Sequence, residues 1–312
     1  MSKKTELSVS VIVATLNPRP AALARTLAAL AAQDLPPDRW ELIVVDNGST
    51  PPLAEQVDLD WHPQSRWLVV CTAGKAHALA AGIRASRAGL ILVVDDDNVL
   101  PTSYLSAGLG IFSTRPRLGG AGGQLIPEFS ATPPDALVPH LPMLAIVQFD
   151  RPREARDGSV MPPGAGCFFR AELAQKWAQL FERDPIRQQL GSRFGAPVWF
   201  QEDIDMCLVV MANNYDLGQF PQLRLMHLIA PARVQLDYLL KLSRNNGAGT
   251  LITRWLWEGP TPARARWREW LHYGRLWRLP ARDRQFALAY WRGERAALAF
   301  MHQHPAYQPV TR

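Results

Sequence analysis

The sequence predicts an α/β protein in which a mostly parallel sheet carries helices on both faces, followed by a helical C-terminal region. Short apolar runs alternate with helix-forming stretches through the first half of the chain. Strands this apolar are covered on both sides, which is typical of parallel sheets joined by helices. The chain has 312 residues, 47% hydrophobic and 20% charged, which is enough to bury a full-sized core. This composition excludes a disordered or collagen-like chain.

Strand and helix signals follow one another along the chain. Strands are expected at 8–14, 41–45, 67–71, 90–94 and 224–229. Helices are expected at 21–32, 75–86 and 202–213, from Ala171 onward, and again from Leu236. The second strand ends in Asp46-Asn47-Gly48-Ser49, which is strong turn chemistry. Residues 127–163 contain many prolines and are expected to form loops that cover a site.

Nothing in the sequence indicates a membrane span or a signal peptide. No apolar run approaches the roughly 18–20 residues that a spanning helix needs, and the N-terminus has no cleavage pattern. Cys71, Cys167 and Cys207 are widely spaced among apolar residues. We expect buried, reduced thiols rather than disulfides or a zinc site. These observations favour a cytoplasmic protein.

The positive charge lies in the last part of the chain. Residues 1–250 carry 23 Lys and Arg against 24 Asp and Glu, whereas 251–312 carry 11 Arg, no Lys and 4 acids. The same segment holds six of the eleven tryptophans. We therefore expect a main domain at 1–235, with halves of about 1–125 and 126–235, and a basic, Trp-rich helical region at 236–312.

Arg and Trp recur at helical spacing in this C-terminal region, as in 264–270 and 275–277. The pattern suits a helix lying on the anionic inner face of a membrane. It also suits a dimer or partner interface, or packing against the main domain with the arginines solvated. The sequence leaves these three roles open. It contains no recognisable nucleic-acid-binding module, so no nucleic-acid partner is expected.

Three polar clusters follow predicted strands of the first half. They are Thr15 with Asn17, Asp46 with Asn47, and the run from Asp95 to Asn98. In an open parallel sheet, ligands bind beyond the carboxyl ends of the strands. Asp and Asn are also common turn residues, so the Asp46 cluster alone is open to either interpretation.

The three consecutive aspartates are the strongest of these signals. Adjacent carboxylates repel one another and raise one another's pKa unless a cation neutralises them. If the strand alternation continues, Asp95 and Asp97 point the same way and Asp96 the other. Two such carboxylates beside a nucleotide crevice suit Mg²⁺ or Mn²⁺ shared with a diphosphate. The alternative is a solvated acidic turn.

Four motifs, in order over residues 8–229, resemble the family 2 inverting glycosyltransferases, which have the GT-A fold. The motifs are VSVIVATLNPRPAAL, IVVDNGST, GKAHALAAGI followed by LILVVDDDNVLP, and WFQEDIDMCLVVMANNYDLGQFPQLRLMHL. The resemblance departs from the usual pattern at Ala14, Leu16, Asn47 and Ala80. Asn47 supplies no second charge after Asp46, and Ala80 weakens any direct contact of its helix with the donor.

The resemblance implies roles for individual residues. Nucleotide-sugar binding would fall to Thr15, Asn17, Asp46, Lys75, Asp95 and Asp96. A divalent Mn²⁺ or Mg²⁺ ion would be held by Asp97 and His227, although His227 also suits a satisfied core histidine. Asp203 would be the general base, with Glu202 positioning it or contacting the acceptor, although acids are also common at helix starts. The acceptor would be lined by Gly164, Ala165, Gly166, Trp199 and Phe200.

The resemblance therefore implies a metal-dependent inverting glycosyltransferase, using a nucleotide-sugar, most simply a UDP-sugar, and a hydroxyl of a glycan or lipid-linked acceptor. Lys75 would neutralise phosphate or hold the acceptor-side acids. Two alternatives come from other classes. A sugar-phosphate nucleotidyltransferase also uses aspartate-held metal, but it opens with a glycine-rich loop that the turn ATLNPRP lacks. A non-catalytic scaffold would keep the fold and bind a membrane or partner through its C-terminal region.

Overall fold

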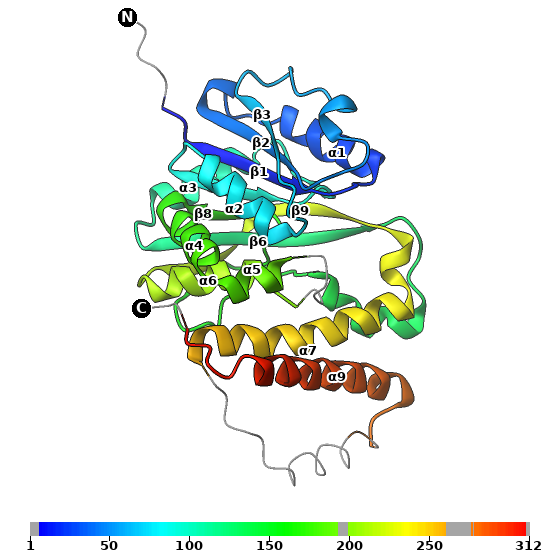
Figure 1. Ribbon diagram of the computed structural model, residues 1–312. Coiled ribbons are helices and arrows are strands. Elements are labelled where there is room, and N and C mark those ends of the chain that lie inside the picture. The colour runs from blue at the N-terminus through cyan, green and yellow to red at the C-terminus, as the bar shows by residue number, and fades with distance from the viewer. Residues whose placement is uncertain (1–5, 193–198, 260–275, 277, 310–312) are drawn as a thin grey trace, which may run out of the picture. The chain divides into compact units, whose positions relative to one another are not determined.

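The computed structural model describes residues 6–192, 199–259, 276 and 278–309 (Figure 1). Contacts divide the chain into two compact units. The first unit comprises Met1–Glu128, Ala145–Ala196 and Glu202–Ile229, and the second comprises Phe129–Leu144, Pro197–Gln201 and Ala230–Arg312. The domain boundary expected after residue 235 stays a prediction.

Within its described residues, the first unit holds a nine-stranded sheet in the order β3-β2-β1-β4-β8-β6-β9-β5, with β7 paired to β9. The strands are β1 (Val9–Thr15), β2 (Trp40–Asp46), β3 (Ser65–Val69), β4 (Leu90–Val94), β5 (Asn98–Val99), β6 (Leu118–Phe129), β7 (Arg153–Ala155), β8 (Cys167–Arg170) and β9 (Asp216–Ile229). β1 pairs in parallel with β2 and β4, and β2 with β3. β8 pairs antiparallel with β4 and β6, and β5 and β7 with β9. The predicted α/β class is confirmed, and the strands β1 to β4 pair in parallel with one another.

Helices cover both faces of this sheet because alternate residues of a strand point to opposite sides. In the first unit the helices are α1 (Pro20–Ala31), α2 (Lys75–Ala85), α3 (Tyr104–Ser113), α4 (Ala171–Arg183), α5 (Pro185–Gly191) and α6 (Glu202–Ala212). Val11 and Val13 of β1 share one buried cluster with Leu27 of α1. Ile12 faces α2, because a Cβ added at Gly82 would lie 2.6 Å from its Cγ2 atom.

Several elements of the first unit were not expected from the sequence, among them β5, β7, β8 and α5, and one expectation was wrong. α3 was missed, and β6 was missed because its glycines disfavour a strand. Close packing explains those glycines, since a Cβ added at Gly119 would lie 2.6 Å from the side chains of Leu173 and Tyr215. Cys71 is exposed, so the expectation of three buried thiols is wrong for that residue, although Cys167 and Cys207 are buried. Cys71 lies just past the end of β3, where no helix covers it.

The second unit contains two long helices, α7 (Leu236–Glu258) and α9 (Ala281–Gln303), which run in the same direction. It also contains the 3₁₀ helices η3 (Asp135–Leu144) and η4 (Pro231–Val234). The backbones of α7 and α9 nearly touch. A Cβ added at Gly247 would lie 2.1 Å from the carbonyl oxygen of Tyr290, and one at Gly293 would lie 1.9 Å from that of Arg244. None of the helices in the described ranges is long and apolar enough to span a membrane.

Aromatic packing stabilises the far end of this helix pair. The Trp255 ring is 2% exposed, and its centroid lies 4.3 Å from that of Tyr307 and 6.1 Å from that of Phe300. At least this tryptophan of the Trp-rich region is therefore a core residue of the second unit. The Arg- and Trp-rich stretches 264–270 and 275–277 lie outside the described residues, apart from Leu276.

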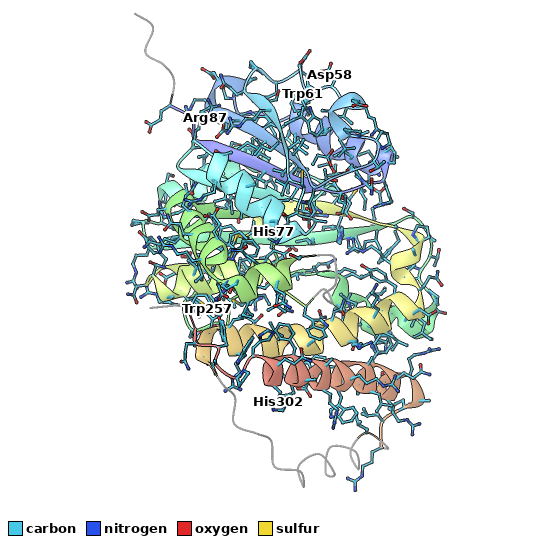
Figure 2. All side chains as sticks on the ribbon, viewed as in Figure 1. Asp58, Trp61, His77, Arg87, Trp257 and His302 are labelled. Atoms are coloured by element: carbon cyan, nitrogen blue, oxygen red, sulfur yellow. The ribbon has the colours of Figure 1, made fainter. Side chains whose placement is uncertain are left out.

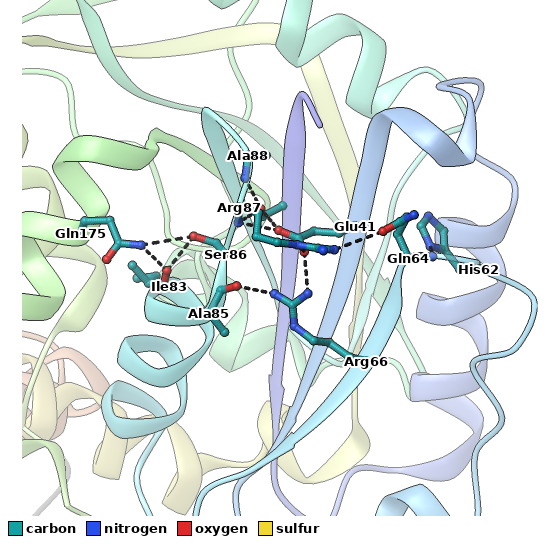
Figure 3. A network of polar contacts seen from close by, with 11 residues as sticks. Glu41, His62, Gln64, Arg66, Ile83, Ala85, Ser86, Arg87, Ala88 and Gln175 are labelled. Atoms are coloured by element: carbon teal, nitrogen blue, oxygen red, sulfur yellow. Dashed lines mark hydrogen bonds and ion pairs between the residues drawn. The ribbon is translucent and has the colours of Figure 1, made fainter. Parts of the chain in front are cut away.

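A buried carboxylate connects three strands near the amino ends of β1 and β2, away from the polar clusters at their carboxyl ends (Figure 3). Glu41 on β2 is fully buried. It accepts hydrogen bonds from Ser10 Oγ at 2.5 Å, Arg66 Nη1 at 2.8 Å and Arg87 Nε at 2.8 Å. Burial alone raises the pKa of this carboxyl, but the hydrogen bonds from Ser10 and Arg87 and the charge of Arg66 outweigh it and lower the pKa.

The variant Glu41→Gln is expected to lower the free energy of unfolding by about 2–4 kcal/mol at pH 7, because two arginines lose their buried counter-charge. The pKa of Glu41 is lower in the folded protein than in the unfolded chain. Its ionised form therefore stabilises the fold above about pH 4, and this contribution is lost as the pH falls through the folded-state pKa. The difference between wild type and variant in urea denaturation should shrink in acid.

The matched control is Glu182→Gln, which removes an exposed acid paired with Arg84 at 2.9 Å. This change is expected to cost less than about 1 kcal/mol. Equal losses in the two variants would contradict a stabilising role for the buried network.

Candidate active site

A lysine ammonium group lies between two carboxylates at the carboxyl ends of the parallel strands. Lys75, the first residue of α2, places its Nζ atom 2.7 Å from Asp95 Oδ1 and 3.3 Å from Glu202 Oε1. Loss of water around the ammonium lowers the pKa of Lys75, but the charges of Asp95 and Glu202 raise it by more, so the lysine stays charged. The geometry thus joins a strand-end acid of β4 to the acidic start of α6.

The loop before α2 explains why the lysine lies at this point. Gly74 has φ = 150°, and a Cβ there would lie 1.9 Å from the carbonyl oxygen of Gly191. Only glycine allows this close approach in that backbone conformation. Asn47 fixes the same loop. Its Oδ1 accepts from the N–H of Gly74 at 2.5 Å, and its Nδ2 donates to the carbonyl of Thr72 at 2.8 Å.

Two residues further along α2, His77 connects this helix to α5 (Figure 2). Its Nε2 atom lies 3.1 Å from the carbonyl oxygen of Gln188 and 3.0 Å from Ser192 Oγ. The ring also packs edge-on against Phe181, with centroids 4.9 Å apart. The start of α2 is therefore held from two sides, which fixes the position of Lys75.

The three aspartates form a tight turn rather than a continued strand. β4 ends at Val94, and the Asn98 N–H donates to the carbonyl of Asp95 at 3.1 Å. The strand alternation behind the expectation that Asp95 and Asp97 face the same way therefore does not extend past Val94. Asp95 pairs with Lys75, whereas Asp97 lies near His227 and Arg19.

Asp96 is held by the end of the neighbouring strand. The hydroxyl of Thr15, the last residue of β1, donates to its Oδ2 atom. Burial raises the pKa of Asp96, the hydrogen bond from Thr15 lowers it, and the charges of Asp97 and Asp95 raise it again, so the pKa lies above its usual value. This contact brings together two of the three strand-end clusters recognised in the sequence.

Asp97 and His227 come together through β-pairing. β5 pairs antiparallel with β9 so that Asn98 lies opposite His227, and the N–H of Leu228 donates to the carbonyl of Asp97 at 2.9 Å. His227 Nε2 lies 3.6 Å from Asp97 Oδ2, and Arg19 Nη2 lies 3.9 Å from the same oxygen. The carboxylate therefore faces an imidazole and a guanidinium.

This donor set fits a divalent ion in its chemistry. Mg²⁺ and Mn²⁺ accept carboxylate oxygens and imidazole nitrogens, and adjacent ligands of an octahedral ion lie about 3 Å apart. Asp97 and His227 provide one oxygen and one nitrogen at 3.6 Å, close to that separation. Within the part of the chain that the structure describes, no group of three or more His, Cys, Asp or Glu side chains is arranged to hold a metal ion. Further ligands would have to come from phosphate or water.

The predicted base lies against the glycine-rich turn before β8. The N–H of Gly164 donates to Asp203 Oδ2 at 3.3 Å, and the N–H of Ile204 donates to Asp203 Oδ1 at 2.9 Å. A Cβ at Gly164 would lie 2.6 Å from the Cβ of Asp203. A side chain at position 164 would therefore displace the carboxylate.

Glu202 differs from its neighbour in its electrostatic surroundings. Burial raises the pKa of Glu202, Lys75 lowers it and Asp203 raises it, with a net increase. Its carboxylate is 17% exposed, so both burial and the neighbouring charges act on it. The two acids at the start of α6 are thus not equivalent.

A fully buried charge network anchors the other side of α6. Arg187 on α5 donates to Asp184 at 2.5 Å and to Asp205 at 3.3 Å. Trp177 Nε1 donates to Asp205 Oδ2 at 2.9 Å. Arg187, Asp184 and Asp205 are all inaccessible to solvent. Asp205 is therefore a pairing residue of the core.

The loops after β1 and β2 hold the remaining donor-side candidates. Both oxygens of Asp46 accept backbone N–H groups, from Ser49 at 2.8 Å and from Leu53 at 3.0 Å. Asn17 has φ = 46°, and its Oδ1 accepts from the N–H of Thr50 at 2.9 Å while its own N–H donates to Ser49 Oγ at 2.8 Å. The two loops are therefore tied to each other.

The acceptor-side candidates lie in different places. Ala165 is 8% exposed, and the carbonyl of Gly166 accepts from the hydroxyl of Tyr104 at 2.7 Å. Trp199 and Phe200 belong to the second unit, where they are 6% and 7% exposed. The Trp199 ring packs edge-on against Phe300 there, with centroids 6.2 Å apart.

Arg19 and Arg187 were not selected from the sequence, and Asn47 was noted there only as part of a strand-end cluster. Each of the three acts through a partner distant in the chain. Arg19 could have been noticed as the one basic residue in the turn directly after β1. Arg187 gave no signal, because an arginine in a polar helix is ordinarily solvated.

The fold and the site together define an α/β protein of the nucleotide-binding type, with acids from several elements gathered at the strand ends. A family model for glycosyl transferase family 2 matches residues 10–177, more than half of the chain. The chain belongs to this family, and the resemblance identified from the sequence motifs is confirmed.

Similarity to individual proteins agrees with this assignment. An N-acetylglucosaminyltransferase from Bradyrhizobium elkanii is 34% identical over 123 residues, which are 38% of this chain and 66% of the relative. The chain thus spans slightly less than two thirds of the length of that relative.

Solved structures with the same fold include S. aureus TarS. A TarS fragment in complex with UDP matches with a TM-score of 0.53 and 13% identity, over 94% of this chain and 92% of the fragment. The fragment in complex with UDP-GlcNAc matches with a TM-score of 0.51 and 14% identity, over 91% and 79%. These likenesses confirm the GT-A fold.

The variant Arg187→Met is expected to lower the free energy of unfolding by about 3–5 kcal/mol, because it leaves Asp184 and Asp205 as unpaired charges in the core. Thermal and urea unfolding would measure the loss. The matched control Arg84→Met breaks an exposed pair with Glu182 and should cost less than about 1 kcal/mol. A stability of Arg187→Met within that same margin would show that the buried network does not anchor α6.

Proposed function

We propose that this chain is a metal-dependent inverting glycosyltransferase, which transfers a sugar from a UDP-sugar to a hydroxyl group of a glycan or lipid-linked acceptor. The observation that carries the proposal is the position of Lys75 between Asp95 and Glu202, with Asp203 next to it on α6. Asp95, which we assign to the donor side, and Glu202, which we assign to the acceptor side, thereby contact the same ammonium group. Family membership supports this function.

The donor in this proposal is UDP-N-acetylglucosamine or a close analogue. The curated relative is described as an N-acetylglucosaminyltransferase, and TarS has been solved with UDP and with UDP-GlcNAc. The nucleotide would lie against the loops after β1 and β2, which contain Thr15, Asn17 and Asp46. Asp95 and Asp96 would contact the ribose or the sugar, and Lys75 would add positive charge near the diphosphate.

Asp97 and His227 would hold the divalent ion, Mn²⁺ or Mg²⁺. When bound, such an ion neutralises the negative charge on a departing diphosphate. Arg19 lies 3.9 Å from Asp97 and is 43% exposed, so its guanidinium is available to a phosphate oxygen as well.

The proton of the acceptor hydroxyl would pass to Asp203. The acceptor oxygen then attacks the anomeric carbon from the face opposite the nucleotide. A new bond forms between the acceptor oxygen and the anomeric carbon as the bond from that carbon to the diphosphate oxygen breaks. This single displacement inverts the configuration at the anomeric carbon. The N–H groups of Gly164 and Ile204 would hold the carboxylate in position for this proton transfer.

Glu202 would position the acceptor rather than accept its proton. Its oxygen already pairs with Lys75, and that ion pair limits repulsion between the two adjacent acids. Gly164, Ala165 and Gly166 would line the acceptor pocket, where small residues allow a sugar to approach. The acceptor role expected for Trp199 and Phe200 stays a prediction, because both side chains are buried in the second unit.

The location and further partners of the protein are part of the same proposal. It would act in the cytoplasm, on an acceptor presented at the inner face of a membrane or in solution, and without nucleic acid. Membrane contact, dimerisation and packing within the protein all remain roles for the basic C-terminal region. The burial of Trp255 favours packing for that residue alone.

Asp97→Asn is expected to weaken binding of UDP in the presence of Mn²⁺ by more than about tenfold, since even indirect supports of a metal ligand contribute that much to affinity. Calorimetry with UDP and Mn²⁺ measures the effect. The exposed control Asp38→Asn should leave the affinity unchanged. If wild type and Asp97→Asn bind UDP equally well with and without Mn²⁺, the metal assignment is wrong.

Asp203→Asn is expected to reduce transfer by about 10²–10⁴-fold, the usual contribution of a general base, while UDP affinity and thermal stability stay near wild type. The assay follows UDP release from UDP-N-acetylglucosamine against a panel of glycoside acceptors. Unchanged turnover in this variant would remove Asp203 from the mechanism.

A further inference from the structure

A groove between α7 and α9 in the second unit has a strong positive charge. It encloses about 380 Å³ and is lined by Leu240, Lys241, Arg244, Gln285, Leu288, Ala289 and Arg292. The α7 residues are one and four positions apart and the α9 residues three, four and seven apart, so each set occupies one helix face. The groove lies beside the close helix contact at Gly293, because Arg244, whose carbonyl oxygen meets Gly293, also lines the groove.

Its three cations are available to a ligand. Lys241, Arg244 and Arg292 are exposed, and no acid among the described residues forms an ion pair with them. The nearby acid Asp283 is paired with His140 at 3.3 Å instead. Arg282 adds a fourth cation beside the groove, where it donates to Gln285 Oε1 at 3.1 Å.

The floor of the groove is apolar. Leu240 and Leu288 are half-buried, and Ala289 is 8% exposed. An apolar floor bordered by cations matches a ligand that joins a phosphate to a hydrocarbon chain. A nucleic acid would find the charges but no aromatic surface in this lining on which to stack its bases.

We propose that this groove binds the phosphate headgroup of an anionic phospholipid, with Lys241, Arg244 and Arg292 on the phosphate and Leu240 and Leu288 against the start of an acyl chain. The second unit would thereby dock on an anionic membrane surface. The proposal does not depend on the transfer reaction, because vesicle binding is measured without donor or acceptor.

The test measures co-sedimentation of the full chain with vesicles of phosphatidylcholine alone and with one third phosphatidylglycerol. Wild type should bind the anionic vesicles, bind neutral ones much more weakly, and lose affinity as salt rises. The double variant Arg244→Gln/Arg292→Gln should bind anionic vesicles roughly thirtyfold more weakly, since each basic residue near such a surface contributes roughly fivefold.

The matched control is Arg84→Gln/Arg117→Gln, which removes the same charge from exposed positions of the first unit. It should retain binding within about threefold. Equal losses of vesicle affinity in both double variants would show that binding depends only on net charge, and would overturn the proposal.

Four other results would also overturn it. These are equal binding to neutral vesicles, release by millimolar inorganic phosphate with no preference for lipid, tighter binding to a single-stranded RNA than to vesicles, and a dimer in sedimentation velocity that the groove variant abolishes. The last result would assign the groove to a second copy of the chain.

Discussion

The candidate site depends on one ammonium group placed where a helix dipole disfavours it. Lys75 opens α2, and positive charge at a helix N-terminus is unfavourable unless carboxylates compensate. Asp95 and Glu202 do so at 2.7 Å and 3.3 Å. Since these acids come from the end of β4 and the start of α6, the same ion pairs set the spacing between them. Without the lysine, five carboxylates at positions 95–97, 202 and 203 would repel one another with little to hold them together.

The two sides of α6 have different surroundings, one in the core and one at the candidate site. Residues two apart on a helix point to nearly opposite sides, so Asp203 and Asp205 have different surroundings. Asp205 lies in the core, fully paired with Arg187 and Trp177. Asp203 faces the turn at Gly164 with backbone donors only. Asp205 fixes the helix in the core, whereas the Asp203 carboxylate has fewer partners. Such an arrangement can hold a base in place and leave it able to accept a proton.

Local patterns were sufficient to predict the strands that end at the site. The apolar runs of β1, β2 and β4 and the polar residues after them could be recognised because both features are contiguous in sequence. Features made by distant partners could not. The glycines of β6 are explained only by side chains such as Tyr215 pressing against the strand. Arg187 is explained only by two aspartates that the fold buries around it, and Asn47 by the loop that its amide fixes.

The turn role and the binding role of Asp46 can be compared by counting the hydrogen-bond acceptor sites of its carboxylate. A carboxylate offers about four lone-pair positions, and the N–H groups of Ser49 and Leu53 use two of them. The side chain is thus a turn residue, as its sequence context indicated, and it still has acceptor capacity for a base N–H. The backbone donors fix the orientation of the carboxylate in advance, so less side-chain entropy would be lost when a ligand binds. The hydrogen bonds that shape this loop are therefore compatible with the binding role that we propose for Asp46.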